Sequence, residues 1–450
     1  MLVAFWVCVG PWTTYSGGYE GADYAETTFS RLDAADWQPT SGPLRTGAAK
    51  VDITPPVGVP LAGYGARKPK ESVGIRDRVF ARAVSFSNGQ STVTIVGGDI
   101  LLVTPHLREA ILDRLDCPPD EVYFTATHTH SGPGGYSPGL LYELVLGSYD
   151  ESVAQRLAEG FAEAVRLSRT GMSDATLRFA RATAEGDAAG RYVRNRLDES
   201  PGYAAAAALV AEGADGRPIG SVVVFPAHAT CLGKENRLLS GDYPGLVQST
   251  LEAEAGGVVL FAAGAVGSMA PVMRKPRGDD LVKSAADDAL SMLRPLVVND
   301  VSIPKNLRVT RREPVREAEI VSRRLRVDLP AQQYRISRRL RLSPIAASYL
   351  HGRRTELHML RVGPVVLLGM PADFSGELAG ELHAEAADMP LTPVVTSFNG
   401  DYIGYLLPRR RYYEDHYESM DMNLFGPACG DYFNALSLRA MRKPPEHARR

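Results

Sequence analysis

Short apolar runs with turn residues at both ends recur along the chain, and segments with apolar residues at helical spacing separate several of them. Thr104 and Pro105 supply an N-cap and a proline for the first helical position, ahead of a helical repeat that includes Leu107 and Ile111. A second amphipathic helix is predicted over 153–165, with its apolar stripe facing the core. This alternation of strand and helix patterns predicts a globular α/β fold.

Residues 79–86 and 91–96 predict a β-hairpin, because both runs are rich in strand-forming residues and an Asn-Gly pair lies between them at 88–89. An earlier strand pattern at 47–53 marks the expected start of the folded body. The loop 57–78 that follows mixes Gly, Pro and basic residues, and it is either a plain surface connection or the border of a site.

Residues 121–135 (EVYFTATHTHSGPGG) combine a strand pattern with two histidines and a glycine-rich turn. His128 and His130 stand two positions apart at the strand end, so their side chains are expected to point the same way. They can serve as two metal ligands, or as a ligand and an acid/base partner. A pair of solvated or hydrogen-bonded loop histidines is the other interpretation, and the spacing alone does not decide.

Four further apolar runs end in residues that can carry chemistry. The runs at 221–225, 257–261, 365–368 and 394–396 lead into His228, Ser268, Asp373 and Tyr405, in that order. In open α/β sheets, ligands bind outside the carboxyl ends of the strands, where several loops converge. Together with the histidine pair, these strand ends predict one shared site, although chance could supply any single one of them.

Composition limits the function classes. The 450 residues are 44% hydrophobic and 23% charged, which allows a large core in two or three domains or in one large α/β unit. A formal net charge of -2 gives no electrostatic reason to expect a nucleic acid partner, and we exclude that class. The four cysteines are scattered without Cys-x-x-Cys spacing, so they indicate neither a thiolate zinc site nor a disulfide framework.

The N-terminal residues bear on localisation. Residues 1–12 (MLVAFWVCVGPW) are apolar throughout, but they are fewer than the ~20 residues that a spanning helix needs. They fit an export h-region, a clipped membrane anchor or a buried N-terminal segment. Residues 13–46, rich in Gly, Ser, Thr and Asp, predict a polar spacer. We therefore expect a protein that is exported or membrane-tethered, in a bacterial envelope.

The region 306–358 differs from the rest of the chain because it is rich in arginine. Arginine alternates with apolar residues at 324–329 and again at 339–342. This period of two predicts strands with one solvated face, at a sheet edge or in a subdomain. A specific anionic or membrane-facing patch is the alternative interpretation.

In their order, these motifs resemble the neutral/alkaline ceramidase family, zinc amidases that split the amide bond of N-acylsphingosine. The resemblance begins at 48–56 (AAKVDITPP) and 62–65 (AGYG), continues through 127–135 (THTHSGPGG) and reaches 425–427 (FGP). It covers nearly all of 48–430, and the HTHSGPGG string is specific. It implies an α/β catalytic domain of mixed β-sheets flanked by helices.

The resemblance also implies the ligands of one Zn²⁺ ion. The first histidine of the family's string is His128, and the histidine of a Phe-Pro-x-His-Ala-Thr string is His228. Asp373 stands where the family has the Glu of a Pro-Gly-Glu-Phe string, so the carboxylate is one methylene shorter. The tyrosine of a Tyr-x-x-Tyr string, the fourth ligand, is Tyr405.

Further residues receive roles by the same resemblance. Tyr417 stands twelve positions after Tyr405, where the family places a second functional tyrosine. Asn195 and Arg196 match a pair that is expected to contact the polar part of the substrate. His130 would support the ligands or handle protons.

The chain departs from the family at the Gly-Asp-Val-Ser-Pro string, which is replaced by 267–271 (GSMAP). Ala270 occupies the position of the serine, and Ser268 occupies that of the aspartate. A covalent serine mechanism is therefore in doubt unless Ser268 is displaced into that role. The other interpretation of Ser268 is a small residue in a glycine-rich turn.

We expect an apolar segment at 1–12, a polar spacer at 13–46, a zinc hydrolase catalytic domain at 47–435 and a polar tail at 436–450. The chain ends about where the family's catalytic domain ends, so no C-terminal immunoglobulin-like domain is expected.

The predicted function is hydrolysis of the amide bond of an N-acyl lipid, ceramide to fatty acid and sphingoid base, by zinc-activated water. Tyr417 and Arg196 are candidate oxyanion donors, and His130 is the candidate general acid. The expected partners are the N-acyl lipid, or another small amide, and a membrane surface. The alternatives are an amidase or esterase with another small substrate, and a non-catalytic relative that binds zinc and lipid.

Overall fold

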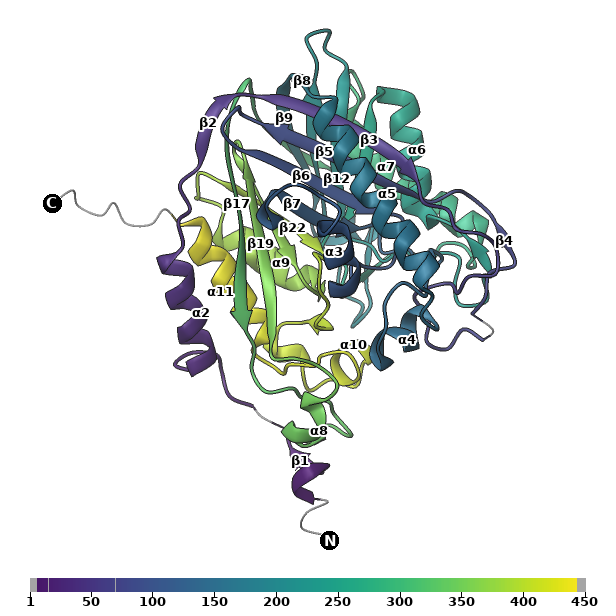
Figure 1. Ribbon diagram of the computed structural model, residues 1–450, viewed down its shortest axis with the longest axis vertical. Helices are drawn as coiled ribbons and strands as arrows, with labels where there is room; N and C mark the ends of the chain where they lie inside the picture. The colour runs from purple at the N-terminus through teal and green to yellow at the C-terminus, as the bar shows by residue number, and fades with distance from the viewer. Residues whose placement is uncertain (1–5, 15, 69, 443–450) are drawn as a thin grey trace, which may run out of the picture.

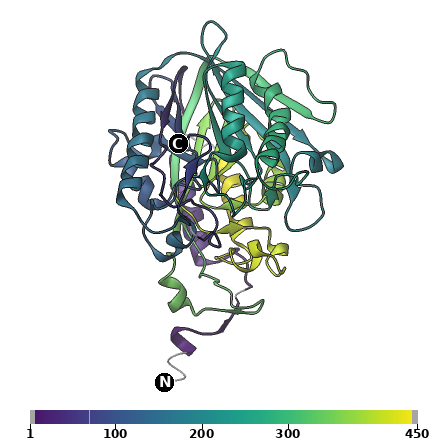
Figure 2. The ribbon, with the colours of Figure 1, turned by 90° about the vertical axis from the view of Figure 1, so that its right-hand side faces the viewer.

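Three five-stranded β-sheets form most of the structure, a computed structural model that describes residues 6–14, 16–68 and 70–442 (Figures 1 and 2). Their strand orders are β7-β6-β5-β3-β8, β14-β12-β11-β9-β16 and β2-β17-β19-β20-β22. Helices lie against all three sheets, so the α/β class with mixed sheets, expected from the sequence, is confirmed.

The strands of the first sheet are β3 (Arg45–Asp52), β5 (Phe80–Ser87), β6 (Thr92–Gly98), β7 (Val122–Ala126) and β8 (Ser173–Asp174). Those of the second are β9 (Thr176–Ala184), β11 (Ala204–Glu212), β12 (Pro218–Phe225), β14 (Val258–Ala263) and β16 (Arg308–Val315). Those of the third are β2 (Thr40–Pro43), β17 (Glu317–Asp328), β19 (Arg354–Val362), β20 (Val365–Met370) and β22 (Thr392–Ser397).

Each large sheet has one parallel strand pair, and in every case that pair lies at one edge of the sheet. The pairs are β6 with β7, β12 with β14, and β20 with β22. The edge strand β7 contacts β14 and β22, and β14 also contacts β22. The carboxyl ends of the three parallel pairs therefore converge, and this convergence positions the site described below.

The faces that the sheets turn toward one another share one hydrophobic cluster. It includes Phe86 and Tyr123 from the first sheet, Leu209 from the second, and Leu360 and Leu367 from the third, all fully buried. Burying a side chain of this size stabilises the fold by roughly 1.5–3 kcal/mol, so this shared cluster holds the three sheets together.

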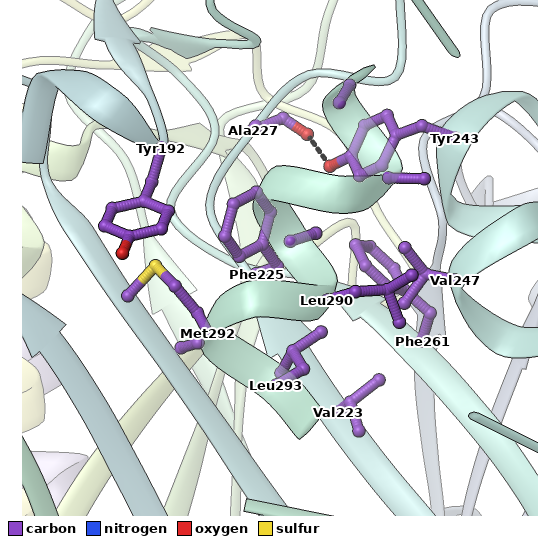
Figure 3. Close-up of a cluster of buried hydrophobic side chains, with 14 of the residues drawn as sticks. Tyr192, Val223, Phe225, Ala227, Tyr243, Val247, Phe261, Leu290, Met292 and Leu293 are labelled. Carbon is purple, nitrogen blue, oxygen red and sulfur yellow. Dashed lines mark hydrogen bonds between the residues drawn. The ribbon is translucent and has the colours of Figure 1, made fainter. Parts of the chain in front are cut away.

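Helices cover the opposite face of each sheet. On the first lie α3 (Pro105–Leu112) and α5 (Glu151–Thr170), on the second α6 (Asp242–Ala255) and α7 (Asp279–Val297), and on the third α2 (Asp23–Ala34), α9 (Gly376–Glu385) and α11 (Cys429–Met441). Figure 3 shows one such core, where Phe225 and Phe261 of adjacent strands pack against Tyr243 of α6 and Leu290 of α7. The Tyr243 hydroxyl donates to the carbonyl of Ala227, which ties α6 to the segment after β12.

Short elements complete the chain. The helices are α4 (Leu140–Leu146), α8 (Pro344–Ser348) and α10 (Tyr417–Met420). Two-residue strands pair β1 (Trp12–Thr13) with β18 (Leu340–Arg341), β4 (Gly74–Ile75) with β13 (Leu238–Leu239), β10 (Arg194–Asn195) with β15 (Met269–Ala270), and β21 (Asp373–Phe374) with β23 (Tyr405–Leu406).

Several local predictions are confirmed. The Thr104 side chain caps α3 by accepting from the backbone N–H of Leu107, with Pro105 in the first turn. Gly89 adopts φ +83° in the turn between β5 and β6, a conformation that only residues such as Gly adopt readily. On α5, Leu157 and Phe161 face the core and are fully buried.

The structure differs from the expected boundaries at both ends. The predicted spacer 13–46 contains α2, whose Ala25 and Leu32 are buried against the third sheet. The predicted tail from 436 begins inside α11, because Leu436, Leu438 and Met441 are buried in the same core. The first part of the predicted apolar segment, residues 1–5, lies outside the described residues, as do 443–450. Among the residues described, none of the helices has the length and apolar character that crossing a membrane requires.

Candidate metal centre

Backbone pairing brings together the segments that follow the parallel strands. A parallel bridge joins Thr129 to Ala229, and the N–H of His130 donates to the carbonyl of Ala229 at 3.1 Å. In the short parallel pair of β21 with β23, Asp373 lies opposite Tyr405. The predicted convergence of strand ends is therefore present for four of the candidate segments.

His128 and His228 are held in the same way. Nδ1 of His128 lies 2.8 Å from the carbonyl oxygen of Leu101, and Nδ1 of His228 lies 2.7 Å from that of Val266. Because a carbonyl oxygen only accepts, each Nδ1 must carry the proton and donate it. This fixed tautomer leaves the Nε2 lone pair of both rings facing the interior of the site, the arrangement that metal-binding histidines use.

The carboxylate of Asp373 faces both of these nitrogens. Its Oδ1 lies 3.2 Å from Nε2 of His228 and 3.5 Å from Nε2 of His128. Oδ1 is buried and makes no hydrogen bond to any residue that the structure describes, while Oδ2 accepts from the hydroxyl of Tyr402 at 2.8 Å. A buried carboxylate oxygen without a donor is costly, so this atom requires a positive partner.

The separations fit a metal ion. Nitrogen and oxygen ligands bind Zn²⁺ at ~2.0–2.2 Å, and two such ligands at a tetrahedral angle are then about 3.3–3.6 Å apart. The two distances of Asp373 Oδ1 to the imidazoles lie close to this range. His128, His130 and His228 also offer ligand atoms that all lie within 4.8 Å of one another. These groups can hold one metal ion with nitrogen and oxygen ligands.

The electrostatics keep the donors in their metal-binding forms. Burial lowers the pKa of His128 to about 3 even though the Asp373 carboxylate opposes that shift. Burial alone would raise the pKa of Asp373, but the facing His128 and His228 rings and the Tyr402 hydroxyl lower it by more. The pKa of this carboxyl is therefore below its usual value. A neutral imidazole and an ionised carboxylate are the forms that bind a metal ion.

The backbone at His128 is strained. Its φ of +59° places a residue with a Cβ in the left-handed region, and Phe398, whose ring stacks on the His128 imidazole at 4.0 Å, has φ +66°. Such conformations cost of order 1–3 kcal/mol and concentrate where function requires a particular side-chain direction. Here the conformation of His128 directs its imidazole toward Asp373, and the ring of Phe398 packs against the face of that imidazole.

Two tyrosines border the carboxylate. The hydroxyl of Tyr405 lies 3.1 Å from Nε2 of His228, and that of Tyr402 donates to Asp373. Burial, with the nearby Asp373 charge, raises the pKa of both hydroxyls well above the usual value. The structure thus places the Tyr405 hydroxyl at the site, next to His228.

His130 lies beside the first imidazole, with its Nε2 3.2 Å from Nε2 of His128. Its Nδ1 is buried and has no hydrogen-bond partner among the described residues. The ring packs against Tyr64 and directly over Gly63, where a Cβ would lie 2.6 Å from the ring. Burial and the neighbouring imidazoles lower the pKa of His130 well below its usual value, so this ring is a neutral, under-bonded group at the site.

Arg196 and Tyr417 both lie beside Tyr405. The Arg196 guanidinium lies 2.5 Å from the carboxylate of Glu418, which is buried. Burial alone would lower the pKa of Arg196, but Tyr405, Glu418 and Asp373 raise it, so the cation is retained. The Tyr417 ring meets Tyr405 edge-on at 6.3 Å and is half exposed. These two residues supply a fixed positive charge and a phenol next to the cluster.

The structure places Asn195 and Ser268 outside this group. The Asn195 side chain donates to Ser200 and accepts from the backbone of Leu197, so it is held within its own turn. The Ser268 hydroxyl is fully buried and hydrogen-bonds Ser375, the N-cap of α9, at 3.0 Å. Within the described part of the chain, no histidine hydrogen-bonds this hydroxyl, so no base is in place to activate it as a nucleophile.

The sequence analysis did not identify three kinds of group that orient or border the site residues. Tyr402 is the first tyrosine of the Tyr-x-x-Tyr string that singled out Tyr405, so the motif contained a signal for it. Glu418 follows the predicted Tyr417 directly, but no charge pattern linked it to the distant Arg196. The carbonyls that orient the two imidazoles are backbone atoms, which no residue pattern can indicate.

A cavity of about 1110 Å³ adjoins the cluster. Tyr402 and Tyr417 belong to its lining, together with apolar residues that include Leu141, Leu350 and Leu424. The polar and charged lining residues include Arg108, Arg326, Arg354, Glu356 and Asp401. The volume exceeds what most small-molecule sites need, so the cavity can take an amphipathic molecule with a long apolar part.

The chain is similar in sequence to a known protein family. The family model described as "Neutral/alkaline non-lysosomal ceramidase, N-terminal" matches residues 44–281. Neutral ceramidase of Pseudomonas aeruginosa is 26% identical over 249 residues, which cover 51% of this chain and 37% of that protein. Neutral ceramidase of Mycobacterium tuberculosis is 25% identical over 221 residues, covering 45% of this chain and 34% of that protein. The matches thus span about a third of the length of these relatives.

Two solved structures share the fold. The crystal structure of the Pseudomonas aeruginosa neutral ceramidase superposes with a TM-score of 0.69 at 20% identity, covering 89% of this chain and 74% of that one. A structure titled "Ceramidase complexed with C2" gives a TM-score of 0.71 at 20% identity, covering 89% and 75% of the two chains. The likeness therefore extends well beyond the region that the sequence comparisons match.

Proposed function

Because the chain belongs to the neutral/alkaline non-lysosomal ceramidase family, we propose that it is a metal-dependent hydrolase that cleaves the amide bond of an N-acyl lipid of ceramide type. The observation that carries the proposal is the buried Asp373 Oδ1, without a hydrogen bond, facing the Nε2 atoms of His128 and His228. The names of the relatives supply the substrate class, since they are called neutral ceramidases.

His128, His228 and Asp373 would hold a Zn²⁺ ion, with Tyr405 as a fourth, weaker ligand. A zinc ion bound there supplies a Lewis acid for the amide carbonyl and lowers the pKa of a water molecule from ~15.7 to about 7. The Nε2 atoms of both imidazoles face Oδ1 of Asp373, and the carboxylate contributes the negative charge that such an ion requires.

Developing negative charge on the carbonyl oxygen needs donors that are already in position. Arg196 is fixed by Glu418 and keeps its charge, and Tyr417 presents a hydroxyl on the same side. A donor of this kind contributes ~3–4 kcal/mol to transition-state stabilisation in comparable sites. Because Arg196 carries a retained positive charge and Tyr417 is half exposed, Arg196 is the stronger candidate for the oxyanion contact.

The leaving amine needs a proton, and His130 is the residue to handle it. Its ring is neutral, so it must first accept a proton from the attacking water and then pass that proton to the amine nitrogen. Its Nε2 lies 3.2 Å from Nε2 of His128, so this nitrogen faces the cluster and is the atom that would take up the proton and return it. The attacking group is water rather than Ser268, whose hydroxyl is bonded to Ser375.

The charged residues of the cavity lining favour a second candidate, an amidase whose small substrate carries a charged or hydrogen-bonding group. Arg326 and Arg354 are exposed residues of this lining, and Arg354 is already paired with Asp328, so Arg326 is the cation that such a group would meet. A non-catalytic relative that binds metal and lipid is the remaining alternative, and turnover tests it directly.

The test is hydrolysis by purified, zinc-loaded protein of a panel of fluorogenic N-acyl amides that includes short-chain ceramide analogues and N-acyl amino acids. We expect chelator-sensitive release of fatty acid from the ceramide analogues, abolished in His128→Ala. Preferential cleavage of the N-acyl amino acids would support the second candidate. Bound metal without turnover of any amide would overturn the catalytic proposal.

A further inference from the structure

We propose that one end of the molecule docks on a bilayer that contains anionic lipids and so brings the mouth of the cavity to the membrane surface. This docking surface is formed by the N-terminal segment 6–14, the segment 335–354 with α8, and α4. The docking itself does not depend on the proposed amidase activity. Only the purpose of docking, access to a lipid substrate, rests on the proposed function.

Two segments that are distant in sequence build the outer part of this surface. Strand β1 pairs with β18, with Trp12 opposite Arg341, and the N–H of Ser343 donates to the carbonyl of Val9 at 2.9 Å. The Ser343 hydroxyl donates to the carbonyl of Cys8, and the Trp6 and Trp12 rings stack at 5.6 Å. Figures 1 and 2 both place the N-terminal segment and α8 together at one end of the molecule, outside the three sheets.

Large apolar side chains are exposed on each part of this end. They are Trp6, Val7 and Val9 of the N-terminal segment, Ile336, Leu340, Ile345 and Tyr349 of the second segment, and Leu140 and Leu144 of α4. Tyr349 is 85% exposed and Leu140 is 70% exposed, so most of the apolar surface of both side chains faces water. An exposed apolar group of this extent indicates a surface that contacts something other than water.

In a solvated edge strand the charged side chains face water and the apolar ones are buried, and β18 shows the reverse. Arg341 is only 7% exposed, whereas its neighbour Leu340 is 37% exposed. The Arg341 guanidinium is occupied inside the protein, where it donates to the carbonyls of Thr13 and Gln332. The prediction of arginines toward solvent is therefore wrong for Arg341, whereas Arg339 is exposed as predicted. The outward side chain of Leu340 agrees with the alternative of a membrane-facing patch.

The charge of this end is positive. Residues 329–355 contain six arginines and no Asp or Glu, and residues 6–14 contain no charged side chain. Arg338 is paired with Asp415, but the exposed Arg339 has no carboxylate partner within the described residues. The carboxylates near this end are Glu143 on α4, Asp328 beside Arg354, and Glu356, Asp401 and Asp421 along the cavity. Arginine beside exposed Trp, Tyr and Leu is the composition of surfaces that bind anionic lipid bilayers.

The docking surface is continuous with the cavity. Leu140 and Leu144 of α4 and Tyr349 beside α8 are exposed and also line the cavity that adjoins the candidate metal centre. Contact of this end with a bilayer would therefore set the opening against the lipid. A lipid substrate could then pass from the membrane into the cavity without crossing water, which is costly for a long acyl chain.

Flotation with lipid vesicles tests the docking without requiring turnover. The probes are vesicles of phosphatidylcholine alone and vesicles of equal parts phosphatidylcholine and phosphatidylglycerol. The variant Ile336→Ser with Ile345→Ser changes two exposed residues that do not line the cavity. Its matched control is Leu167→Ser with Ile303→Ser, because these residues are similarly exposed and lie outside the docking surface.

We expect the wild type and the control to float with the mixed vesicles and to bind phosphatidylcholine alone at least tenfold more weakly. The Ile336/Ile345 variant should lose at least tenfold in partitioning. Arg339→Gln should lose about fivefold, whereas Arg316→Gln, an exposed arginine elsewhere, should lose little. Hydrolysis of a water-soluble short-chain amide should be unchanged in the Ile336/Ile345 variant, while hydrolysis of vesicle-embedded substrate should fall.

Three results would overturn the docking proposal. The wild type could fail to float with the mixed vesicles. The Ile336/Ile345 variant and its control could float equally well. The purified wild type could be a dimer that the Ile336/Ile345 variant alone dissociates, which would assign the surface to a second copy of the chain. Absence of any amidase activity, with flotation as expected, would reject the proposed function and leave the docking in place.

Discussion

Oδ1 of Asp373 lies 3.5 Å from Nε2 of His128, and although both residues are almost fully buried, no proton joins the two atoms. The His128 proton is on Nδ1, where it is donated to Leu101, and the Asp373 carboxyl has a lowered pKa. An anionic oxygen and a nitrogen lone pair at this distance attract a cation. The candidate metal centre follows from this pair and from the equivalent approach of His228.

Replacing Asp373 by Asn tests the charge at this centre. The change keeps the shape of the side chain and the contact with Tyr402 but removes the negative charge, so we expect zinc affinity to fall by at least a hundredfold. Asp373→Glu keeps the charge and should lose much less. Isothermal titration with Zn²⁺ measures both, and Asp415→Asn on the surface is the control. Equal affinity in Asp373→Asn and the wild type would remove Asp373 from the ligand set.

His128 makes the stability of the metal-free protein depend on pH. Its pKa is about 3 in the folded state against about 6.5 when unfolded, so the unfolded chain binds more protons between these values. The stability is therefore complete above pH ~6.5 and declines as the pH falls toward 3, by up to ~1.4 kcal/mol per pH unit for this one group. Thermal unfolding of metal-free wild type and His128→Gln across this range should show the shallower slope in the variant. Parallel slopes would contradict the account of a neutral, buried His128.

Ser268 distinguishes water attack from a covalent serine route. Its hydroxyl is engaged with Ser375, so Ser268→Ala should lower the rate of hydrolysis less than about tenfold and cost ~1 kcal/mol of stability. Steady-state kinetics with a soluble amide and thermal unfolding give the two numbers. Complete loss of activity in Ser268→Ala with the metal still bound would instead establish a role for this serine in the chemistry.

The ion pair of Arg196 and Glu418 tests the proposed oxyanion contact. Removing the guanidinium in Arg196→Ala should reduce kcat by about 10²–10³ and leave the zinc content unchanged. Glu418→Gln should have a smaller effect of the same kind, because this carboxylate only positions the arginine. Rescue of Arg196→Ala by added guanidine would confirm the assignment. A change in KM alone would show that Arg196 binds substrate equally in the ground and transition states.

A buried ion pair ties the first sheet to α6. Arg82 is 3% exposed and bonds Asp99, which is 1% exposed and also accepts from Gln248 of α6. Breaking such a pair from one side costs ~3–5 kcal/mol, so Asp99→Asn should lower the free energy of unfolding by this amount. Asp174→Asn, whose side chain is 96% exposed, should change it by less than about 0.5 kcal/mol. Urea unfolding measures both variants.

Much of the fold follows from the sequence because strand ends and helix caps are local signals. The runs before His128, His228 and Asp373 were predicted as strands from their apolar residues, and each of them is one. The cap at Thr104 has a side-chain signature, and the structure confirms it. The arrangement of three sheets around one cluster had no such signal, because it depends on contacts between residues that are hundreds of positions apart.

The candidate site was predictable only in part for the same reason. His128, His228, Asp373 and Tyr405 were named from motifs, and the structure brings them together. Whether Ser268 belonged with them could not be read from a glycine-rich turn, since its partner Ser375 lies on a different segment. The sequence pattern also could not predict that Arg341 is buried while Leu340 is exposed, because this arrangement depends on pairing with the N-terminal segment.

The metal content and coordination of the purified protein test the candidate centre most directly. Elemental analysis and zinc K-edge absorption should find one zinc ion per chain with nitrogen and oxygen ligands at ~2.0–2.2 Å, lost when His128 and His228 are both changed to Ala. Folded wild-type protein that retains no metal in the presence of zinc, or a double variant that retains it unchanged, would contradict the assignment of His128, His228 and Asp373 as a metal centre.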